Sequence, residues 1–263
     1  MAAERPFVTS TKNPLVQRFR AAAAGEIDGV MVAEGLRLVG EALAAGVPIL
    51  EAAVAPRCAD AALRQRLQAA ARSFVECSDE VLASLSGLDT PPGVAVVLQR
   101  PQLGESDLLR GESAPLVVAA AGVRDPGNLG SLLRAAEGAG ASGVVTLRGG
   151  ADPFRDKAVR GSMGSVFRLP VLHGLDPAGL VAFVRRHRLQ LVVADGSGER
   201  LHTQADLRRP LVLVVGAEAA GVPQELLAAA DVRVRIPLRP PVESLNVAVA
   251  AGVLLYEAQR QRA

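Results

Sequence analysis

The sequence predicts an α/β fold in which a mainly parallel sheet carries helices on both faces. Nearly continuous apolar runs recur along the C-terminal half, and helical patterns with polar positions separate them. Strands that are buried on both faces have this continuous apolar pattern, and parallel strands need crossover connections, usually helices. A smaller α/β unit precedes this half.

Helix and strand signals alternate along residues 1–100, which is a normal size for a domain. We expect helices at 13–23, 36–45, 59–71 and 80–85, and strands at 30–33, 49–54, 73–77 and 94–98. Residues 101–113 are rich in Gly, Pro, Ser and charge and have no apolar period. The sequence therefore predicts a first domain over 1–100, a linker over 101–113 and a second domain over 114–263.

The second domain repeats the alternation on a larger scale. We expect strands at 116–121, 143–147, 168–171, 189–194, 211–215 and 232–236, and helices at 129–139, 156–162, 177–187, 223–230 and 246–262. The strands are short and rich in Val, Leu and Ala, which favours a sheet buried between helices.

Polar segments follow three of these strands. Residues 124–130 follow the strand at 116–121, residues 216–221 follow the strand at 211–215, and Ser244-Leu245-Asn246 comes after the strand at 232–236. Open α/β sheets bind ligands at the carboxyl ends of their strands. Ser244 and Asn246 can also serve simply as caps of the last helix. Their occurrence beside two other polar segments favours a binding site.

At these positions the chain resembles the SpoU family, in the SPOUT class of RNA methyltransferases. The family has three signature motifs, and the sequence IPLRPPVESLNVAVA matches the third of them. Leu238 stands where Met is usual, Pro240 where Gly is usual and Ala248 where Ser is frequent. The matching polar residues are Asn128 and Arg134 in the first motif, Gly216 and Glu218 in the second, and Ser244 and Asn246 in the third.

The resemblance implies that S-adenosylmethionine is the cofactor and that a ribose 2'-hydroxyl of RNA is the methyl acceptor. Arg134 would act as a base, or would hold the target phosphate and stabilise developing charge. Asn128 would position the ribose or orient Arg134. Glu218 would face the acceptor or fix its loop, and Ser244 and Asn246 would orient the nucleotide or Arg134. The implied cofactor-binding residues are Gly216, Ala217, Gly221, Ile236, Leu238, Leu245 and Asn246.

The resemblance also implies a deep trefoil knot in the catalytic sheet and a homodimer formed through the knotted region. The segments 8–14 and 32–35 resemble a substrate-binding domain that precedes many SpoU catalytic domains and is similar in fold to a ribosomal protein. A capped helix entry at Ser10 or Asn13 is the alternative reading of the first segment. The candidate RNA contacts are Arg124, Arg155, Lys157 and Arg160.

Composition is consistent with a globular protein that has well-filled cores, because 49% of its 263 residues are hydrophobic. Its net charge of +2 does not by itself indicate nucleic-acid binding. No apolar run is long enough to span a bilayer and the N-terminus lacks a secretion signal, so we expect a cytoplasmic protein without a membrane partner. Cys58 and Cys77 lack metal-ligand spacing, so no metal is expected.

The leading hypothesis is an S-adenosylmethionine-dependent 2'-O-methyltransferase of structured RNA, with 23S ribosomal RNA as the favoured substrate. Transfer RNA is the alternative substrate. A noncatalytic RNA-binding or ribosome-assembly protein of the same fold is the alternative from another functional class.

Overall fold

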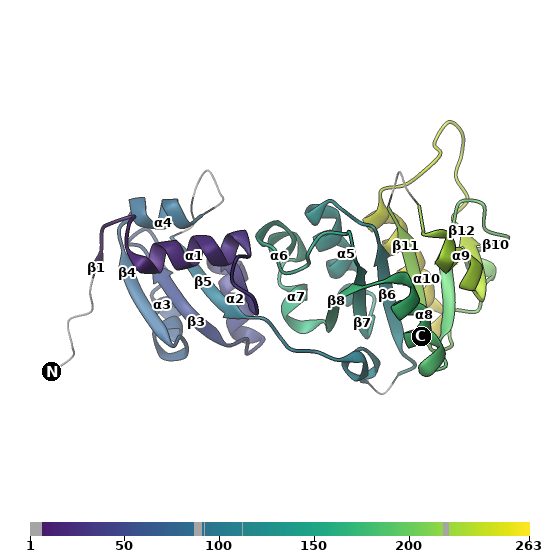
Figure 1. Cartoon of the computed structure of the whole chain (residues 1–263), viewed down its shortest axis with the longest axis horizontal. Coiled ribbons are helices and arrows are strands. Elements are labelled where there is room, and N and C mark those ends of the chain that lie inside the picture. The colour runs from purple at the N-terminus through teal and green to yellow at the C-terminus, as the bar shows by residue number, and fades with distance from the viewer. Residues whose placement is uncertain (1–6, 87–90, 92, 112, 218–220) are drawn as a thin grey trace. The chain divides into compact units, whose positions relative to one another are not determined.

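The computed structural model describes residues 7–86, 91, 93–111, 113–217 and 221–263. The chain folds into two compact units, Met1–Gln102 with Phe154–Arg160, and Leu103–Pro153 with Gly161–Ala263. Figure 1 shows helices and strands alternating along each unit.

The N-terminal unit contains a five-stranded sheet in the order β1-β4-β3-β5-β2. β5 runs antiparallel to β2 and β3, and the remaining pairs are parallel. Its core joins Phe19 of α1 and Leu82 of α4 to one face of the sheet, whereas α2 contacts β2 and β5, and α3 contacts β3. The elements are β1 (Phe7–Val8), α1 (Pro14–Ala24), β2 (Val30–Glu34), α2 (Leu36–Ala44), β3 (Ile49–Val54), α3 (Ala61–Ala70), β4 (Ser73–Cys77), α4 (Asp79–Leu85) and β5 (Val94–Gln99).

The C-terminal unit contains a seven-stranded sheet in the order β10-β12-β9-β11-β6-β7-β8, and all its pairs are parallel. Its elements are η1 (Glu105–Leu109), β6 (Leu116–Ala121), α5 (Pro126–Gly138), β7 (Gly143–Leu147), α7 (Ser165–Arg168), β8 (Val171–Leu175), α8 (Pro177–Arg186), β9 (Gln190–Ala194), β10 (Arg200–Leu201), η2 (His202–Gln204), β11 (Leu211–Gly216), α9 (Gln224–Ala229), β12 (Val232–Arg235) and α10 (Val247–Arg262). Helix α6 (Asp156–Ser162) spans the boundary between the two groups of residues.

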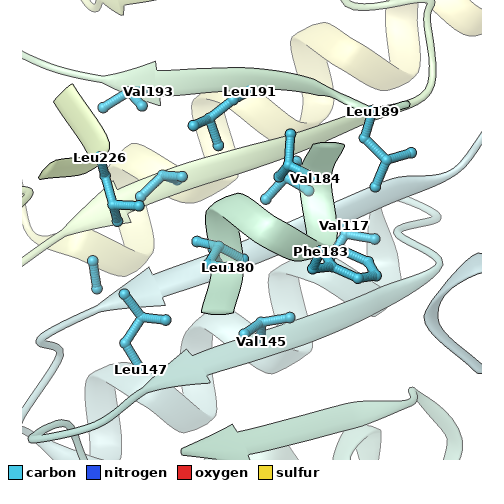
Figure 2. Packing of buried hydrophobic residues seen from close by; sticks show 14 of the residues in the cluster. Val117, Val145, Leu147, Leu180, Phe183, Val184, Leu189, Leu191, Val193 and Leu226 are labelled. Carbon is cyan, nitrogen blue, oxygen red and sulfur yellow. The ribbon is translucent and has the colours of Figure 1, made fainter. Parts of the chain in front are cut away.

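Helices cover both faces of the parallel sheet, as the unbroken apolar runs predict. Phe183 of α8 and Leu226 of α9 pack with Val117, Val145 and other alternate strand residues in one buried cluster. In Figure 2, Leu189 lies at one end of this cluster, while Val193 and Leu226 lie at the other. On the opposite face α5 and α10 pack against each other, and they contact β7 and β11. The predicted α/β fold class is confirmed, and the knot remains a prediction of the resemblance.

One predicted strand is wrong. The segment 168–171 was expected to be a strand, but residues Ser165–Arg168 form the helix α7, and β8 begins only at Val171. Gly164, with φ of 95°, precedes α7, and Pro170 separates the helix from the strand. Within the predicted linker, η1 buries Leu108 completely in the core of the C-terminal unit.

Candidate active site

A cavity of about 460 Å³ lies where β9, β11 and β12 end. These strands are neighbours in the parallel sheet, so their carboxyl ends meet at one edge. Its volume falls within the range of small-molecule sites. The lining residues are Ala194, Asp195, Gly196, Val215, Gly216, Ala217, Gly221, Val222, Gln224, Leu227, Val234, Ile236, Leu238, Glu243, Ser244, Leu245, Val247 and Ala250.

The structure brings most of the predicted cofactor residues to this cavity. Backbone positions from the second motif and apolar side chains from the third line it together. Asn246 is not among the lining residues, but its neighbours Leu245 and Val247 are. The predicted cofactor residues that line the cavity are Gly216, Ala217, Gly221, Ile236, Leu238 and Leu245.

Gly216 is required by a close approach of backbone segments. A Cβ atom added to Gly216 would lie 2.4 Å from the carbonyl carbon of Gly221. Gly221 has φ of +65°, and its amide donates a 2.8 Å hydrogen bond to the carbonyl oxygen of Ala217. The Ala217 amide in turn donates to the carbonyl oxygen of Ala121, at 3.0 Å. Glycine therefore lets the backbone form this wall of the cavity without a side chain in the way.

Asn246 and Asn128 connect the starts of two helices. The Asn246 side-chain oxygen caps α10 by accepting from the amides of Ala248, at 3.0 Å, and Val249, at 3.4 Å. Its Nδ2 donates to Oδ1 of Asn128 at 2.9 Å, across 118 positions of sequence. Asp125 caps α5 by accepting from the Asn128 amide at 2.8 Å. Capping and bridging are thus combined in Asn246, and this contact joins the first motif to the third.

The other predicted catalytic residues differ in what the structure describes. Arg134 lies on α5, two turns after Asn128, where it is exposed and has no hydrogen-bond or ion-pair partner in the described part of the chain. Ser244 is exposed and lines the cavity. Glu218 lies outside the described residues. The catalytic role of Arg134 stays a prediction of the family resemblance.

Two carboxylates are the charged groups among the described residues that line the cavity. Asp195 accepts from Nε of Arg233 at 2.9 Å and from the Ser197 amide at 3.0 Å. Burial alone would raise the pKa of Asp195, but the hydrogen bonds from Ser197 and Arg233 hold it below its ordinary value. Glu243 is exposed and forms no ion pair within the described segments. Neither residue is among those predicted from the sequence, although Asp195 directly follows a strand ending at this edge.

The predicted RNA contacts do not all lie in the unit that carries the cavity. Arg124 is exposed just before the Asp125 cap of α5. Arg155, Lys157 and Arg160 are grouped by contacts with the N-terminal unit. Arg160 forms an ion pair with Asp156, one turn earlier in α6, so part of its charge is already neutralised.

The described segments contain no cluster of three His, Cys, Asp or Glu side chains that could hold a metal ion. Among those same segments, none of the helices has the length and hydropathy to cross a membrane.

A model described as the SpoU rRNA Methylase family matches residues 115–256. The chain belongs to this SpoU family. A second model, described as an MRM3-like substrate binding domain, matches residues 19–96. The family membership confirms the resemblance read from the three motifs, and with it the prediction of an RNA methyltransferase.

The similarity to relatives of this SpoU methylase covers most of the chain. An uncharacterized tRNA/rRNA methyltransferase of Synechocystis sp. is 33% identical over 262 residues, covering 97% of this chain and 94% of the relative. The 23S rRNA guanosine 2'-O-methyltransferase RlmP of Bacillus subtilis is 34% identical, covering 68% of this chain and 69% of the relative. The crystal structure of an AdoMet-bound rRNA methyltransferase from Sinorhizobium meliloti has a TM-score of 0.85 and 32% identity, and the match covers 97% of each chain.

Proposed function

We propose that this SpoU methylase transfers a methyl group from S-adenosylmethionine to a ribose 2'-hydroxyl of 23S ribosomal RNA. The observation that carries the proposal is the Asn128–Asn246 bridge, which joins two of the family's motifs beside the cavity. The named Bacillus subtilis relative acts on this class of RNA. The Sinorhizobium meliloti structure, similar over 97% of this chain, contains the cofactor.

The cavity fits S-adenosylmethionine in the chemistry of its walls. The cofactor supplies an electrophilic methyl group on a positively charged sulfur. Apolar side chains such as Leu238 and Leu245 suit its adenosyl group, and the backbone at Gly216 and Ala217 offers hydrogen-bonding groups without bulk. The carboxylates of Asp195 and Glu243 suit a cation, and the described lining contains no basic side chain.

Positioning is the main task of this chain's side chains, since the cofactor is already activated. Arg134 would bind the phosphate of the target nucleotide and stabilise the charge that develops on the attacking oxygen. Asn128 would hold the ribose, and its own orientation is set by Asn246. Ser244, on the cavity wall, would orient the nucleotide, and Glu218 would support the acceptor side.

The test is transfer of labelled methyl groups to unmodified 23S and transfer RNA, followed by mass mapping of the nucleoside. Arg134→Ala should lower the rate by about 10²-fold or more, because it removes transition-state charge stabilisation. Ser131→Ala, exposed one turn earlier on the same helix, is the matched control. Label in transfer RNA alone would identify the alternative substrate. Cofactor binding without transfer to either RNA would point to an assembly-stage particle as the substrate. Absence of both cofactor binding and transfer would contradict the enzyme proposal and favour a noncatalytic RNA-binding role.

The proposed molecular organisation is a cytoplasmic homodimer. Helix α10 exposes Val249, Val253 and Tyr256 with exposed fractions of 53%, 37% and 53%. Their spacing places them along one helix face, and such an apolar stripe is suited to a protein interface. Sedimentation of Val253→Glu should then show monomers, and a wild-type protein that is active as a monomer would contradict the dimer.

We assign a separate role to each domain. Residues 1–100 would bind the RNA substrate and residues 114–263 would carry out methyl transfer. Residues 101–113 would link these two domains. The match of residues 19–96 to a substrate-binding domain supports the first assignment. Among the predicted RNA contacts, Arg124 would serve from the catalytic domain, and Arg155, Lys157 and Arg160 would add phosphate contacts.

A further inference from the structure

The edge of the parallel sheet opposite the cavity gathers arginines from two separate parts of the sequence. The run at 185–188 precedes β9, and the pair at 208–209 precedes β11. These strands are neighbours, with Gln190 in register with Leu211. The Gln190 amide donates to the carbonyl oxygen of Pro210 at 2.9 Å. This bond holds the segments that precede β9 and β11 side by side.

The arginines surround a depression of about 490 Å³. Three of its lining side chains are cationic and one is anionic, so its lining carries an excess of positive charge. Leu189 and Val184 form part of its floor, and both belong to the buried core of the sheet. The lining residues are Val184, Arg185, Arg188, Leu189, Gln190, Arg209, Pro210 and Asp231.

Ion pairs inside the protein use only some of these arginines. Arg185 binds Asp231 at 2.9 Å and also donates to the Ala229 carbonyl oxygen at 2.8 Å. Arg209 lies 3.8 Å from Asp206, too far for a hydrogen bond. Arg188 has no ion-pair or hydrogen-bond partner for its guanidinium in the described segments. The cations at Arg188 and Arg209 therefore remain available to an external anion.

Ion pairs next to the depression do not neutralise its excess positive charge. Arg186 binds Glu105 at 2.6 Å, and His187 contacts the same carboxylate at 3.0 Å. Arg208 binds Asp206 at 2.8 Å. The carboxylates that face this edge are thus each bound to an arginine already.

The backbone of Arg188 is unusual for its residue type. Its φ of 54° is in the left-handed region, directly after the end of α8. Glycine is the usual residue at this position of a helix terminus, because a side chain there is strained. An arginine kept in a strained position is a reason to look for a function of its side chain.

Gln190 adds a requirement for a hydrogen-bond donor. Its Oε1 atom is buried and has no hydrogen-bond partner among the described residues. Because the residue lines the depression, rotation of its side chain would bring this oxygen to a bound ligand. A phosphodiester would bind the two arginines, and a ribose 2'-hydroxyl is a donor that a DNA backbone lacks. We propose that this amino edge of the sheet binds the sugar–phosphate backbone of the substrate RNA, away from the methylated nucleotide. The proposal rests on the proposed function in taking RNA as the substrate.

Arg188→Gly is the most informative variant, because it separates the effect of the strained backbone on stability from the effect of the guanidinium on RNA binding. Relief of backbone strain should raise the unfolding temperature, whereas loss of the guanidinium should weaken RNA binding. Arg188→Lys retains the charge and the strain, and should stay close to the wild type in both measurements. A role in stability alone predicts no loss of RNA affinity in Arg188→Gly.

The binding experiment uses full-length protein, an unmodified 23S ribosomal RNA transcript and single-stranded DNA of the same sequence, at several salt concentrations. Arg188→Gly with Arg209→Ala should reduce RNA affinity about tenfold or more and lower the salt slope by about 1.4 to 1.8, the value for two phosphate contacts. Gln190→Ala should narrow the preference for RNA over DNA. The S-adenosylmethionine Kd and the rate at saturating RNA should not change.

Unchanged RNA affinity and salt slope in the double variant would overturn the proposal while leaving the proposed function intact. Equal preference for RNA and DNA in the wild type would overturn the ribose contact at Gln190. A wild-type protein that binds and methylates no RNA would instead contradict the proposed function itself.

Discussion

The carboxyl and amino edges of the seven-stranded sheet are built from different chemistry. At the carboxyl edge, neutral amides, glycine backbone and apolar side chains surround a cavity whose charged lining residues are Asp195 and Glu243. At the amino edge, Arg185, Arg188 and Arg209 line a depression with Asp231. At one end of the sheet the cavity lining is mostly uncharged and carries two carboxylates. At the other end the surface is basic.

This separation has a physical reason. A cationic cofactor would be repelled by arginines lining its pocket, whereas the RNA backbone needs positive charge for affinity. Placing the two requirements at opposite ends of the strands lets each site keep the charge that suits its ligand. Arg134, on α5, would bring a positive charge close to the transferred group without lining the cavity.

The largest expected effect comes from Gly216→Ala at the carboxyl edge. The new Cβ would lie 2.4 Å from the backbone of Gly221, so the cavity wall must shift, at a cost of about 1–3 kcal/mol in stability. We expect S-adenosylmethionine binding to be abolished in calorimetry. Gly196→Ala is the control, because this residue also lines the cavity but its added Cβ would meet no atom within 4 Å. Equal binding by the two variants would show that the wall does not depend on the close approach.

Asn246→Asp separates the two roles of Asn246. A carboxylate can still cap α10, where negative charge is favourable, but it cannot donate to Asn128. We expect unchanged thermal stability and a fall in methyl transfer of about tenfold, because the Asn128 oxygen loses its donor. Asn246→Ala should lose both the activity and about 1 kcal/mol of stability. Full turnover by Asn246→Asp would reduce the bridge to a structural contact.

The carboxyl edge was largely predictable from sequence because its determinants are local. Gly216 directly follows an apolar strand run, Ser244 and Asn246 lie in the loop and helix start after the run at 232–236, and parallel strands bring such positions to one edge. The strand order itself is not local. The family resemblance, rather than the apolar pattern, supplied the roles of Asn128 and Arg134.

The amino edge could not be predicted in the same way. The arginines at 185–188 and at 208–209 each look like an ordinary solvated run until the register of β9 with β11 places them together. Similarly, nothing local distinguishes the expected strand at 168–171 from the helical turn that the left-handed Gly164 initiates. Long-range strand pairing and the conformation of a single residue such as Gly164 are not determined by the local sequence pattern.

Glu243→Gln tests whether the charge of the cavity distinguishes the cofactor from its product. S-adenosylhomocysteine lacks the positive sulfur, so an acidic cavity should favour S-adenosylmethionine by charge alone. Loss of a nearby carboxylate should weaken the binding free energy of S-adenosylmethionine by about 1 kcal/mol in water, which is about a fivefold higher Kd. The Kd of S-adenosylhomocysteine should change little. Glu225→Gln, an exposed acid that does not line the cavity, is the control. A parallel change in both affinities would indicate a steric effect instead.

The smallest expected effect is that of Glu105→Gln at the amino edge. The hydrogen bond from Arg186 lowers the pKa of Glu105. Burial acts in the opposite direction, and a hydrogen bond from His187 adds to the lowering. Because the pKa in the folded protein is below that in the unfolded chain, the stabilisation is present above the unfolded pKa of about 4.3 and is lost as the pH falls through the folded value. The pair is partly exposed, so we expect a loss below about 1 kcal/mol at pH 7 that fades in acid, measured by denaturant unfolding. RNA binding should become tighter, since the substitution releases Arg186. Weaker RNA binding would mean that Arg186 serves the fold and not the basic surface.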